Sequence, residues 1–213
     1  MENIKEQKNY LKEWYTKTAK QYDSWDTEGK LDAEFEGIKE LLNVKKGEKV
    51  LDVATGTGIY LILAAKRDAI CYGVDITPDI LQVAKNKVKA LKLKNVKELK
   101  IADADNLPYK DNSFDWITCI GMFEYYPIEH AQKILIEFKR VLNNTGKIIM
   151  DFPDINNPEA HTFKSKSESV NTKVYLYNFN KIEKMLKDLG LKIVKKQVKR
   201  IEIQLLLEKG VQE

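Results

Sequence analysis

Residues 50–58, with the sequence Val-Leu-Asp-Val-Ala-Thr-Gly-Thr-Gly, constrain the fold of this chain more than any other segment. A short apolar run ends there in a glycine-rich turn, and apolar residues at helical spacing resume over 59–66. Glycines in such a turn let the backbone approach a ligand closely, and the first N–H groups of the following helix favour an anionic group. The segment therefore predicts a strand, a turn that can bind a ligand, and a helix. A tight strand–helix turn that binds nothing is the alternative on these residues alone.

The same change of period recurs along the chain. Strands are predicted at 49–53, 70–74, 96–101, 114–120 and 147–152, and helices at 31–43, 59–66, 78–91 and 128–142. The sequence Asn-Asn-Thr-Gly at 143–146 is typical of a turn. Strands that alternate with helices indicate right-handed βαβ units. We therefore expect an α/β fold, a doubly wound and mostly parallel sheet with helices on both faces.

The alternation stops after residue 152. Residues 153–178 show no clear period and are predicted to form a long loop. A helix over 179–189 is expected to end at Gly190, and two apolar runs follow at 191–198 and 201–207. The gap between these runs is too short for a crossover helix, so the two strands must be antiparallel. The predicted sheet therefore has one reversed strand near its edge.

The N-terminal part reads as an amphipathic helix over residues 3–22. One side of it carries Tyr10, Leu11, Trp14, Tyr15 and Thr18. A chain of 213 residues, of which 43% are hydrophobic, is long enough for a single domain with a large core. We expect one domain over residues 1–213.

Charge and composition exclude several classes of function. The net charge is +4, and most lysines alternate with acids, which predicts solvated helix faces and no nucleic-acid partner. The richest basic cluster, at 195–200, alternates with apolar residues as an exposed strand would. The first residues do not resemble a signal peptide, and no apolar run is long enough to span a bilayer, so a cytoplasmic protein without a membrane span is expected. The oligomeric state, monomer or homodimer, stays open.

Cysteine and histidine usage is sparse. Cys71 and Cys119 lie in apolar stretches, so they are predicted to be buried thiols in a reducing compartment rather than a disulfide. The two histidines are far apart in the sequence, and no spacing is typical of a metal site. We expect no metal.

Carboxylates stand at the ends of successive predicted strands. Asp75 lies 23 residues after Asp52 and ends the second strand, where an acid can accept hydrogen bonds from ribose hydroxyls. Its alternative role is to cap the helix that begins at Pro78, although Thr77 can supply that cap. Asp103 ends the third strand and could accept a hydrogen bond from an adenine amino group. Strand ends of a parallel sheet meet in one crevice, so these acids are predicted to line a common site.

Four ordered segments together resemble the class I S-adenosylmethionine (SAM)-dependent methyltransferases. They are D-V-A-T-G-T-G, G-V-D-I, A-D-A-x-x-L-P-Y and S-F-D-W-I, within about residues 40–152. The resemblance implies a Rossmann-like seven-stranded sheet whose last strand is antiparallel, SAM as the cofactor, and methyl transfer to a small molecule by in-line displacement. The first segment and the stretch L-P-Y-K-D-N-S-F-D are also similar to the ubiquinone and menaquinone C-methyltransferase subgroup. Residues 121–127 depart from that subgroup, and 153–178 is short for a quinone lid.

The resemblance also implies a set of cofactor-binding residues. The glycine loop, Asp52, Ala54, Thr55, Gly56 and Gly58, is expected at the methionine portion. Asp75 is expected to bind the ribose, Ile76 to pack on adenine, and Asp103 with Ala104 to hold the adenine edge. Ile120 and Gly121 are expected to border the methionine end, and Tyr22 to reach the methionine carboxylate. Residues 1–30 would form a lid helix over the cofactor. An ordinary amphipathic helix packed on the core is the alternative for that segment.

Methyl transfer from a cationic donor mostly requires alignment and exclusion of water, and a base only if the acceptor must lose a proton. The catalytic candidates near the expected pocket are Glu124, Tyr126 and His161, while His130 is expected to lie on the surface. Residues 153–178, with Tyr125, Tyr126 and the N-terminal helix, are predicted to wall the acceptor pocket. The lysines of that segment, Lys164, Lys166 and Lys173, favour an acceptor with some negative charge.

Three other functions fit parts of the sequence. A nicotinamide-dependent oxidoreductase would use the same strand–turn–helix, but it would want a third glycine after Gly58, where Ile59 stands. A SAM-binding protein without catalysis would have the same motifs. A methyltransferase acting on RNA or protein is disfavoured by the dispersed charge.

Overall fold

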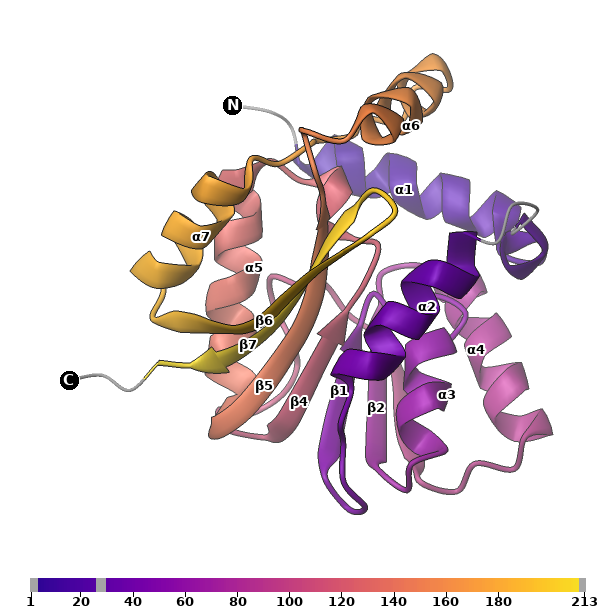
Figure 1. Ribbon diagram of the computed structural model, residues 1–213. Coiled ribbons are helices and arrows are strands. Elements are labelled where there is room, and N and C mark those ends of the chain that lie inside the picture. The colour runs from indigo at the N-terminus through magenta and orange to yellow at the C-terminus, as the bar shows by residue number, and fades with distance from the viewer. Residues whose placement is uncertain (1–3, 26–29, 211–213) are drawn as a thin grey trace.

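The computed structural model describes residues 4–25 and 30–210, and its centre is a seven-stranded sheet in the order β3-β2-β1-β4-β5-β7-β6 (Figure 1). The strands are β1 (Lys49–Val53), β2 (Ile70–Asp75), β3 (Val96–Ile101), β4 (Phe114–Cys119), β5 (Leu142–Pro153), β6 (Leu191–Lys199) and β7 (Glu202–Lys209). The first five strands pair in parallel, and β7 runs antiparallel to both β5 and β6. The predicted fold class, including the one reversed strand near the edge, is confirmed.

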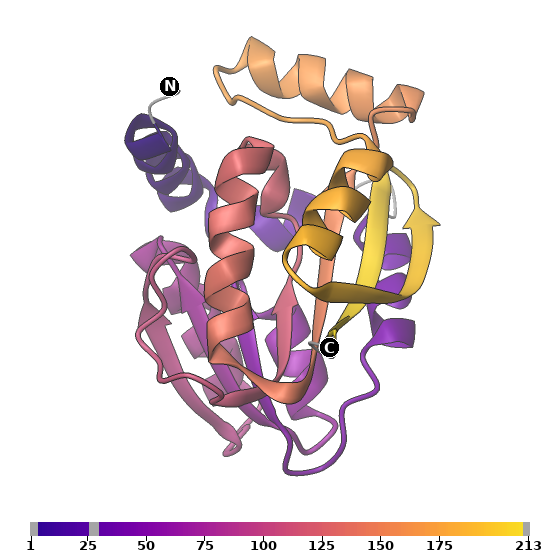
Figure 2. The same cartoon turned by 90° about the vertical axis from the view of Figure 1, so that its left-hand side faces the viewer.

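Helices cover both faces of the sheet. On one face lie α2 (Lys30–Leu41), α3 (Ile59–Ala65) and α4 (Pro78–Ala90), and on the other lie α5 (Ile128–Val141) and α7 (Phe179–Asp188) (Figures 1 and 2). Each face has its own apolar core, one around Ile38, Leu42 and Leu61 and the other around Phe123 and Phe138. Burial of these two cores holds the strand ends in fixed positions.

The N-terminal segment lies across the edge of the sheet where the parallel strands end. Helix α1 (Ile4–Thr18) is followed by a short 3-10 turn, η1 (Tyr22–Trp25), so the predicted helix over 3–22 ends four residues early. Leu11 is the one fully buried residue of α1. Residues 1–3 and 26–29 of the predicted lid segment lie outside the described residues.

The turn predicted at 143–146 falls inside the bounds of β5 but is confirmed by the pairing, because residues 143–146 have no partner in β4 or β7. Strand β5 begins at Leu142, directly after α5, and pairs with β4 through a register shift between Phe114 and Trp116. The turn chemistry survives locally, because Asn143 Oδ1 accepts a hydrogen bond from Thr145 N (3.1 Å) inside the irregular start of the strand. The regular pairing of β5 with β4 and β7 thus begins at Lys147, after this local turn.

The loop predicted at 153–178 contains a helix, α6 (Pro158–Ser169). Periodicity could not reveal it, because only Ala160 is buried and the helix has no apolar stripe. Its start does carry a signal: the Asn157 side chain accepts from Glu159 N (2.9 Å), and Pro158 occupies the first turn. A short 3-10 turn, η2 (Phe123–Tyr125), likewise follows β4.

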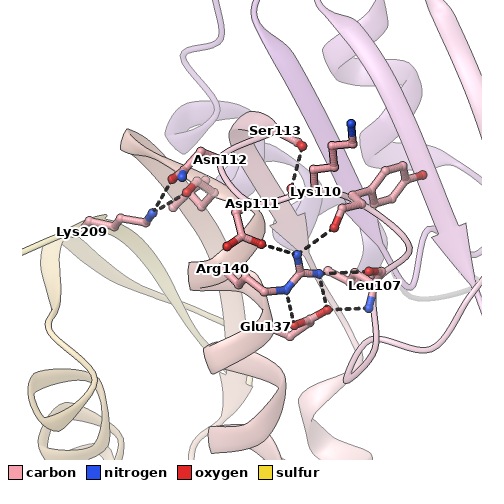
Figure 3. Close-up of polar contacts among 10 residues, drawn as sticks. Leu107, Lys110, Asp111, Asn112, Ser113, Glu137, Arg140 and Lys209 are labelled. Atoms are coloured by element: carbon pink, nitrogen blue, oxygen red, sulfur yellow. Dashed lines mark hydrogen bonds and ion pairs between the residues drawn. The ribbon is translucent and has the colours of Figure 1, made fainter.

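One arginine fixes the segment that leaves β3. Arg140 of α5 donates to the carboxylates of Glu137 and Asp111 and to two backbone carbonyls, Leu107 O (3.0 Å) and Tyr109 O (2.8 Å) (Figure 3). Glu137 in turn accepts from Leu107 N (2.8 Å). A planar guanidinium can make these bonds at the same time, whereas an ammonium cannot. The segment 102–113 is therefore tied to the α5 core.

Two further sequence predictions concern burial and membranes. Cys71 and Cys119 are buried free thiols, as predicted, and burial raises the pKa of Cys71 to about 12. Within residues 4–25 and 30–210, no helix has the length and apolar character needed to cross a membrane.

Candidate functional site

A pocket of about 660 Å³, including its open mouth, lies where β1, β2 and β4 end and α1 crosses above them. Most of the predicted cofactor residues line it: Tyr22, Ala54, Gly56, Asp75, Ile76, Asp103, Ala104 and Ile120. Gly121, predicted with Ile120 at the methionine end, also lines it. The other lining residues were not predicted to bind the cofactor: Leu11, Tyr15, Val53, Thr77, Ile80, Ala102, Met122, Tyr125 and Tyr126. The convergence predicted from the strand ends is therefore observed, and it takes place beneath the N-terminal helix.

The glycine loop adopts backbone angles that explain its composition. Ala54, Gly56 and Gly58 all have positive φ, of 54°, 52° and 86°. A Cβ at Gly56 would meet no atom closer than 3.9 Å, so the space beside it is open and belongs to the pocket. A Cβ at Gly58 would instead lie 3.2 Å from Ala84 Cβ. Gly56 thus leaves room for a ligand, and Gly58 lets α3 approach α4.

Asp52 supports the loop from below rather than lining the pocket. Its carboxylate is buried and accepts hydrogen bonds from Thr55 Oγ1 and Thr118 Oγ1, each at 2.5 Å. Burial raises the pKa of Asp52 to about 6, and the two hydroxyl bonds oppose that rise. Thr55 and Gly58 also lie outside the pocket lining, and the contacts that the structure gives these three residues hold the turn.

Asp75 reaches from the end of β2 to the glycine loop. Its Oδ2 accepts from Gly56 N (2.9 Å), and its Oδ1 accepts from Thr77 N (2.8 Å). The Thr77 side chain makes no capping bond, so the prediction that Thr77 would leave Asp75 uncommitted is wrong. Burial raises the pKa of Asp75, and the backbone N–H bonds oppose the rise. The carboxylate still borders the pocket, with lone pairs left for a ligand.

Asp103 is joined to the N-terminal helix. Lys8 Nζ of α1 lies 2.8 and 2.7 Å from the two carboxylate oxygens of Asp103 and 2.8 Å from Asp105 Oδ2. The Lys8 side chain is only 13% exposed. This cation keeps the pKa of Asp105 below its usual range, against the effect of its burial. The expected adenine-side acid is therefore already paired with a residue of the helix above the pocket.

Polar contacts attach the N-terminal segment at several other points. Thr16 Oγ1 donates to Asp79 Oδ2 of α4 (2.9 Å), and Thr57 Oγ1 donates to Asp23 Oδ1 of η1 (2.6 Å). Tyr10 OH donates to Val170 O, just after α6, at 2.5 Å. Since α1 buries only Leu11 fully, these bonds are a large part of what holds it above the pocket.

Two of the proposed catalytic residues lie in the connection between β4 and α5. Tyr126 lines the pocket, and burial raises the pKa of its hydroxyl, so it is a neutral donor near pH 7. Glu124 is buried in η2 but is not among the pocket-lining residues. Its carboxylate raises the pKa of both Tyr15 and Tyr125, in addition to the larger effect of their burial. The carboxyl group of Glu124 therefore lies close behind this wall of the pocket.

The histidines differ from expectation in their positions. His130, predicted on the surface, is buried with its Nε2 3.1 Å from Asp105 Oδ2 and its ring 4.9 Å from that of Tyr126. Burial lowers its pKa, as does the charge of Lys8. His161 is exposed on α6, near Ile155 O (2.7 Å), and no residue of 153–178 lines the pocket. The structure does not bring His161 to the site.

Sequence reasoning missed Lys8 and, as cofactor-side residues, Leu11 and Tyr15. All three lie at helical spacing along one side of α1, which is a signal for a shared face but not for what that face covers. Among residues 4–25 and 30–210, no group of His, Cys, Asp and Glu side chains could hold a metal ion.

The sequence of this chain is similar to those of methyltransferases. A family described as a methyltransferase domain matches residues 44–204, which include every strand from β1 to β6. A demethylmenaquinone methyltransferase of Bacillus mycoides is 41% identical over 112 residues, 51% of this chain and 46% of the relative. The chain thus aligns with about half the length of such curated relatives. A phosphatidylethanolamine N-methyltransferase of Cereibacter sphaeroides is 31% identical over 151 residues, 70% of this chain and 72% of the relative.

Solved structures share the fold at low sequence identity. Magnesium protoporphyrin IX methyltransferase of Synechocystis, with bound S-adenosylhomocysteine (SAH), has a TM-score of 0.76 at 19% identity and covers 94% of this chain and 98% of its own. A methyltransferase of Haloferax volcanii in complex with the activator Trm112 has a TM-score of 0.78 at 15% identity and covers 92% and 97%. These likenesses confirm the Rossmann-like architecture.

Proposed function

The chain belongs to the methyltransferase domain family, and from this premise we propose that it binds SAM in the pocket beneath α1 and transfers the methyl group to a small-molecule acceptor. One observation carries the proposal. Asp75, at the tip of β2, bonds Gly56 N in the glycine loop of β1, so an acid and an open loop meet within a single pocket. Ligands of open parallel sheets bind in this position, outside the carboxyl ends of the strands.

The pocket residues fit the parts of SAM. Asp75 is positioned to accept hydrogen bonds from the ribose hydroxyls with its remaining lone pairs. Ile76, Ile80 and Ala104 give apolar surface for adenine, beside Asp103. The open space next to Gly56 accommodates the methionine portion, with Ile120 and Tyr22 bordering it. Asp52, Thr55 and Gly58 serve by shaping the loop.

Methyl transfer from SAM requires little acid–base catalysis by the protein. Bound SAM supplies a methyl group on a cationic sulfur, a leaving group that needs no protonation. The protein's part is to align the acceptor with that methyl and to exclude water. Helix α1 covers the pocket and serves the second task as a lid, held by Lys8 and Thr16. Tyr126 can donate a hydrogen bond to the acceptor but cannot act as a base near pH 7, because its pKa is raised.

The acceptor is proposed to be a small molecule, without nucleic acid. The relatives act on different molecules by their names, a quinone and a phospholipid amine, so their names do not fix the acceptor here. The family match argues against the nicotinamide-dependent alternative. The activator Trm112 is the partner of the Haloferax volcanii neighbour, and we do not assign it to this chain. Residues 153–178 are proposed to act through the lid, since Tyr10 and Gln7 of α1 bond the chain just after α6.

The test of this function is turnover of labelled SAM. The protein is incubated with methyl-labelled SAM and, in separate reactions, with pools of amines, phenols, thiols or quinols, with RNA, or with protein, and SAH and labelled products are measured. We expect SAH formation that depends on one acceptor pool. SAM binding with no turnover on any pool would support a SAM-binding protein without catalysis. Turnover only on RNA or protein would exclude the small-molecule acceptor.

A further inference from the structure

Three of the four tyrosines that line the pocket gather where α1 and η1 approach η2. The hydroxyl oxygens of Tyr15 and Tyr125 are 3.1 Å apart, and their rings meet edge to face with centroids 6.3 Å apart. The Tyr22 ring lies 5.8 Å from that of Tyr15. Tyr125 follows Ile120, at the expected methionine end, by only five residues. This tyrosine cluster (Tyr15, Tyr22 and Tyr125) is thus assembled partly from the lid and partly from the sheet edge.

The Tyr15–Tyr125 pair has an excess of hydrogen-bond acceptors. Within the described part of the chain, each of the two hydroxyls bonds only the other. A phenol group has one proton and two lone pairs, so the bond between them leaves one proton and three lone pairs. Burial, and the charge of Glu124, hold the pKa of both hydroxyls well above the usual value. The pair therefore stays neutral and is suited to a ligand that donates hydrogen bonds.

The electrostatics of the pocket favour a cation. Among the described residues that line it, the charged ones are Asp75 and Asp103, and none is a lysine or arginine. Buried Glu124 lies directly before Tyr125 in η2. The lysines that suggested an anionic acceptor lie elsewhere: Lys164 is 3.7 Å from Glu168 on α6, and Lys173 Nζ lies over the Tyr175 ring. An anionic acceptor at the Tyr15–Tyr125 pair would meet no lysine or arginine among the described residues that line the pocket.

Resting on the proposed function, we infer that the tyrosine cluster receives a small aliphatic amine as the methyl acceptor. The bound ammonium first releases an N–H proton to water, and the lone pair of the neutral amine nitrogen then forms a bond to the methyl carbon as the carbon–sulfur bond breaks. SAH leaves as a neutral thioether, and any proton that the new ammonium carries can pass to water. The positive charge moves from sulfur to nitrogen. Tyrosine ring faces stabilise a cation within about 6 Å, so the cluster serves both the amine and its product.

The test compares three probes of nearly the same shape and different charge. Dimethylethanolamine, isoamyl alcohol and isovalerate are titrated into wild-type protein saturated with SAH. The amine is expected to bind at least about tenfold more tightly than the neutral or anionic probe, a difference of about 1.4 kcal/mol. Methyl transfer from SAM to the amine is measured in parallel, with the other two probes as controls.

Single hydroxyl deletions localise the effect. Tyr125→Phe and Tyr15→Phe are expected to weaken amine binding about threefold to tenfold, with a smaller effect on SAH affinity. Tyr72→Phe is the matched control, because the Tyr72 ring packs against Tyr109 and Phe114 away from the pocket. Equal or tighter binding of alcohol or isovalerate, or no amine binding at all, overturns the inference while SAH binding leaves the proposed function standing. Failure of wild-type protein to bind SAH overturns the proposed function itself.

Discussion

The segment after β3, residues 102–113, is held at each end by one cationic side chain, and the two attachments differ in kind. Arg140 holds its later part through the carboxylate of Asp111 and two backbone carbonyls, from a helix whose face is buried in the core. Lys8 holds its start through the side chains of Asp103 and Asp105 alone, from a helix with one fully buried residue. The segment 102–113 is thus bound to the core through α5, which we call the core side, and to α1 through ion pairs, which we call the lid side.

The difference between the two attachments shows how one side of a binding site can be preorganised while the other can open to admit a ligand. The glycine loop, Asp75 and the Arg140 attachment belong to the sheet and its core, where opening would expose apolar surface. The lid is held chiefly by polar contacts, and those of Thr16 and Tyr10 are exposed to water, where such contacts are individually weak. We therefore expect changes on the core side to alter stability or abolish binding, and changes on the lid side to alter affinity modestly without unfolding the protein.

The largest effect is expected at Gly56. Gly56→Val should abolish measurable SAM binding, because its side chain would enter the pocket beside the loop. Gly47→Val is a matched control: Gly47 also has positive φ and open space around it, but it lies outside the pocket. Both variants should lose stability to similar backbone strain, at least about 1–2 kcal/mol. Calorimetric titration with SAM separates them, and equal affinity in the two variants would contradict the role of Gly56.

Arg140→Lys should cost about 1–3 kcal/mol of unfolding free energy, because an ammonium cannot replace the forked bonds to Glu137, Asp111 and the backbone. The control is Arg200→Lys, since Arg200 approaches a single carboxylate, that of Glu159, at 3.4 Å. Urea unfolding of both variants measures the difference. A loss in Arg140→Lys no larger than in Arg200→Lys would show that the core-side attachment contributes little.

The raised pKa of Asp52 predicts that the free energy of unfolding depends on pH. Its pKa is about 6 in the folded protein and about 4 when unfolded. Between these values the folded state binds more protons, so the stability contributed by Asp52 is complete below about pH 4 and is lost as the pH rises through 6. Relative to Asp52→Asn, wild-type protein should therefore lose about 1–3 kcal/mol between pH 4.5 and 7. A stability difference independent of pH would argue against a raised pKa.

The smallest effect is expected from the lid. Lys8→Met should weaken SAH binding about twofold to tenfold and leave the thermal midpoint of the ligand-free protein nearly unchanged. Lys12→Met, an exposed substitution on the same helix, should change neither quantity. Hydrogen exchange of the α1 amides with and without SAH reports closure directly. A large fall in stability with Lys8→Met would mean that α1 is part of the core, and the comparison would fail.

The sheet and its strand-end residues could be predicted because their signals are local. The short apolar strand and glycines of 50–58, and Asp75 at the next strand end, follow from period and turn chemistry. The helix α6 could not be found by period, because an exposed helix has no apolar stripe. Its cap at Asn157 and Pro158 was the signal available.

The lid contacts could not be predicted for a different reason. Lys8 and Asp103 are 95 residues apart, and nothing in either local sequence specifies their pairing. His130 was misplaced because its partner, Asp105, comes from a different element, although α5 itself was predicted correctly. Asp75 was found, yet its bond to Gly56 N required the folded loop. Long-range pairing of polar side chains is thus the part of the site that only the structure supplies.

The central claim is that the pocket binds SAM through Asp75, and one measurement tests it most directly. SAH is titrated calorimetrically into wild-type protein and into Asp75→Ala, with circular dichroism to establish that both are folded. Loss of hydrogen bonds to a charged group should weaken binding by about 1.5–3 kcal/mol, or roughly 10- to 150-fold. Saturable binding by wild-type protein with this loss in the variant is the predicted result. Equal affinity in the two proteins, or no binding by the wild type, would contradict the account.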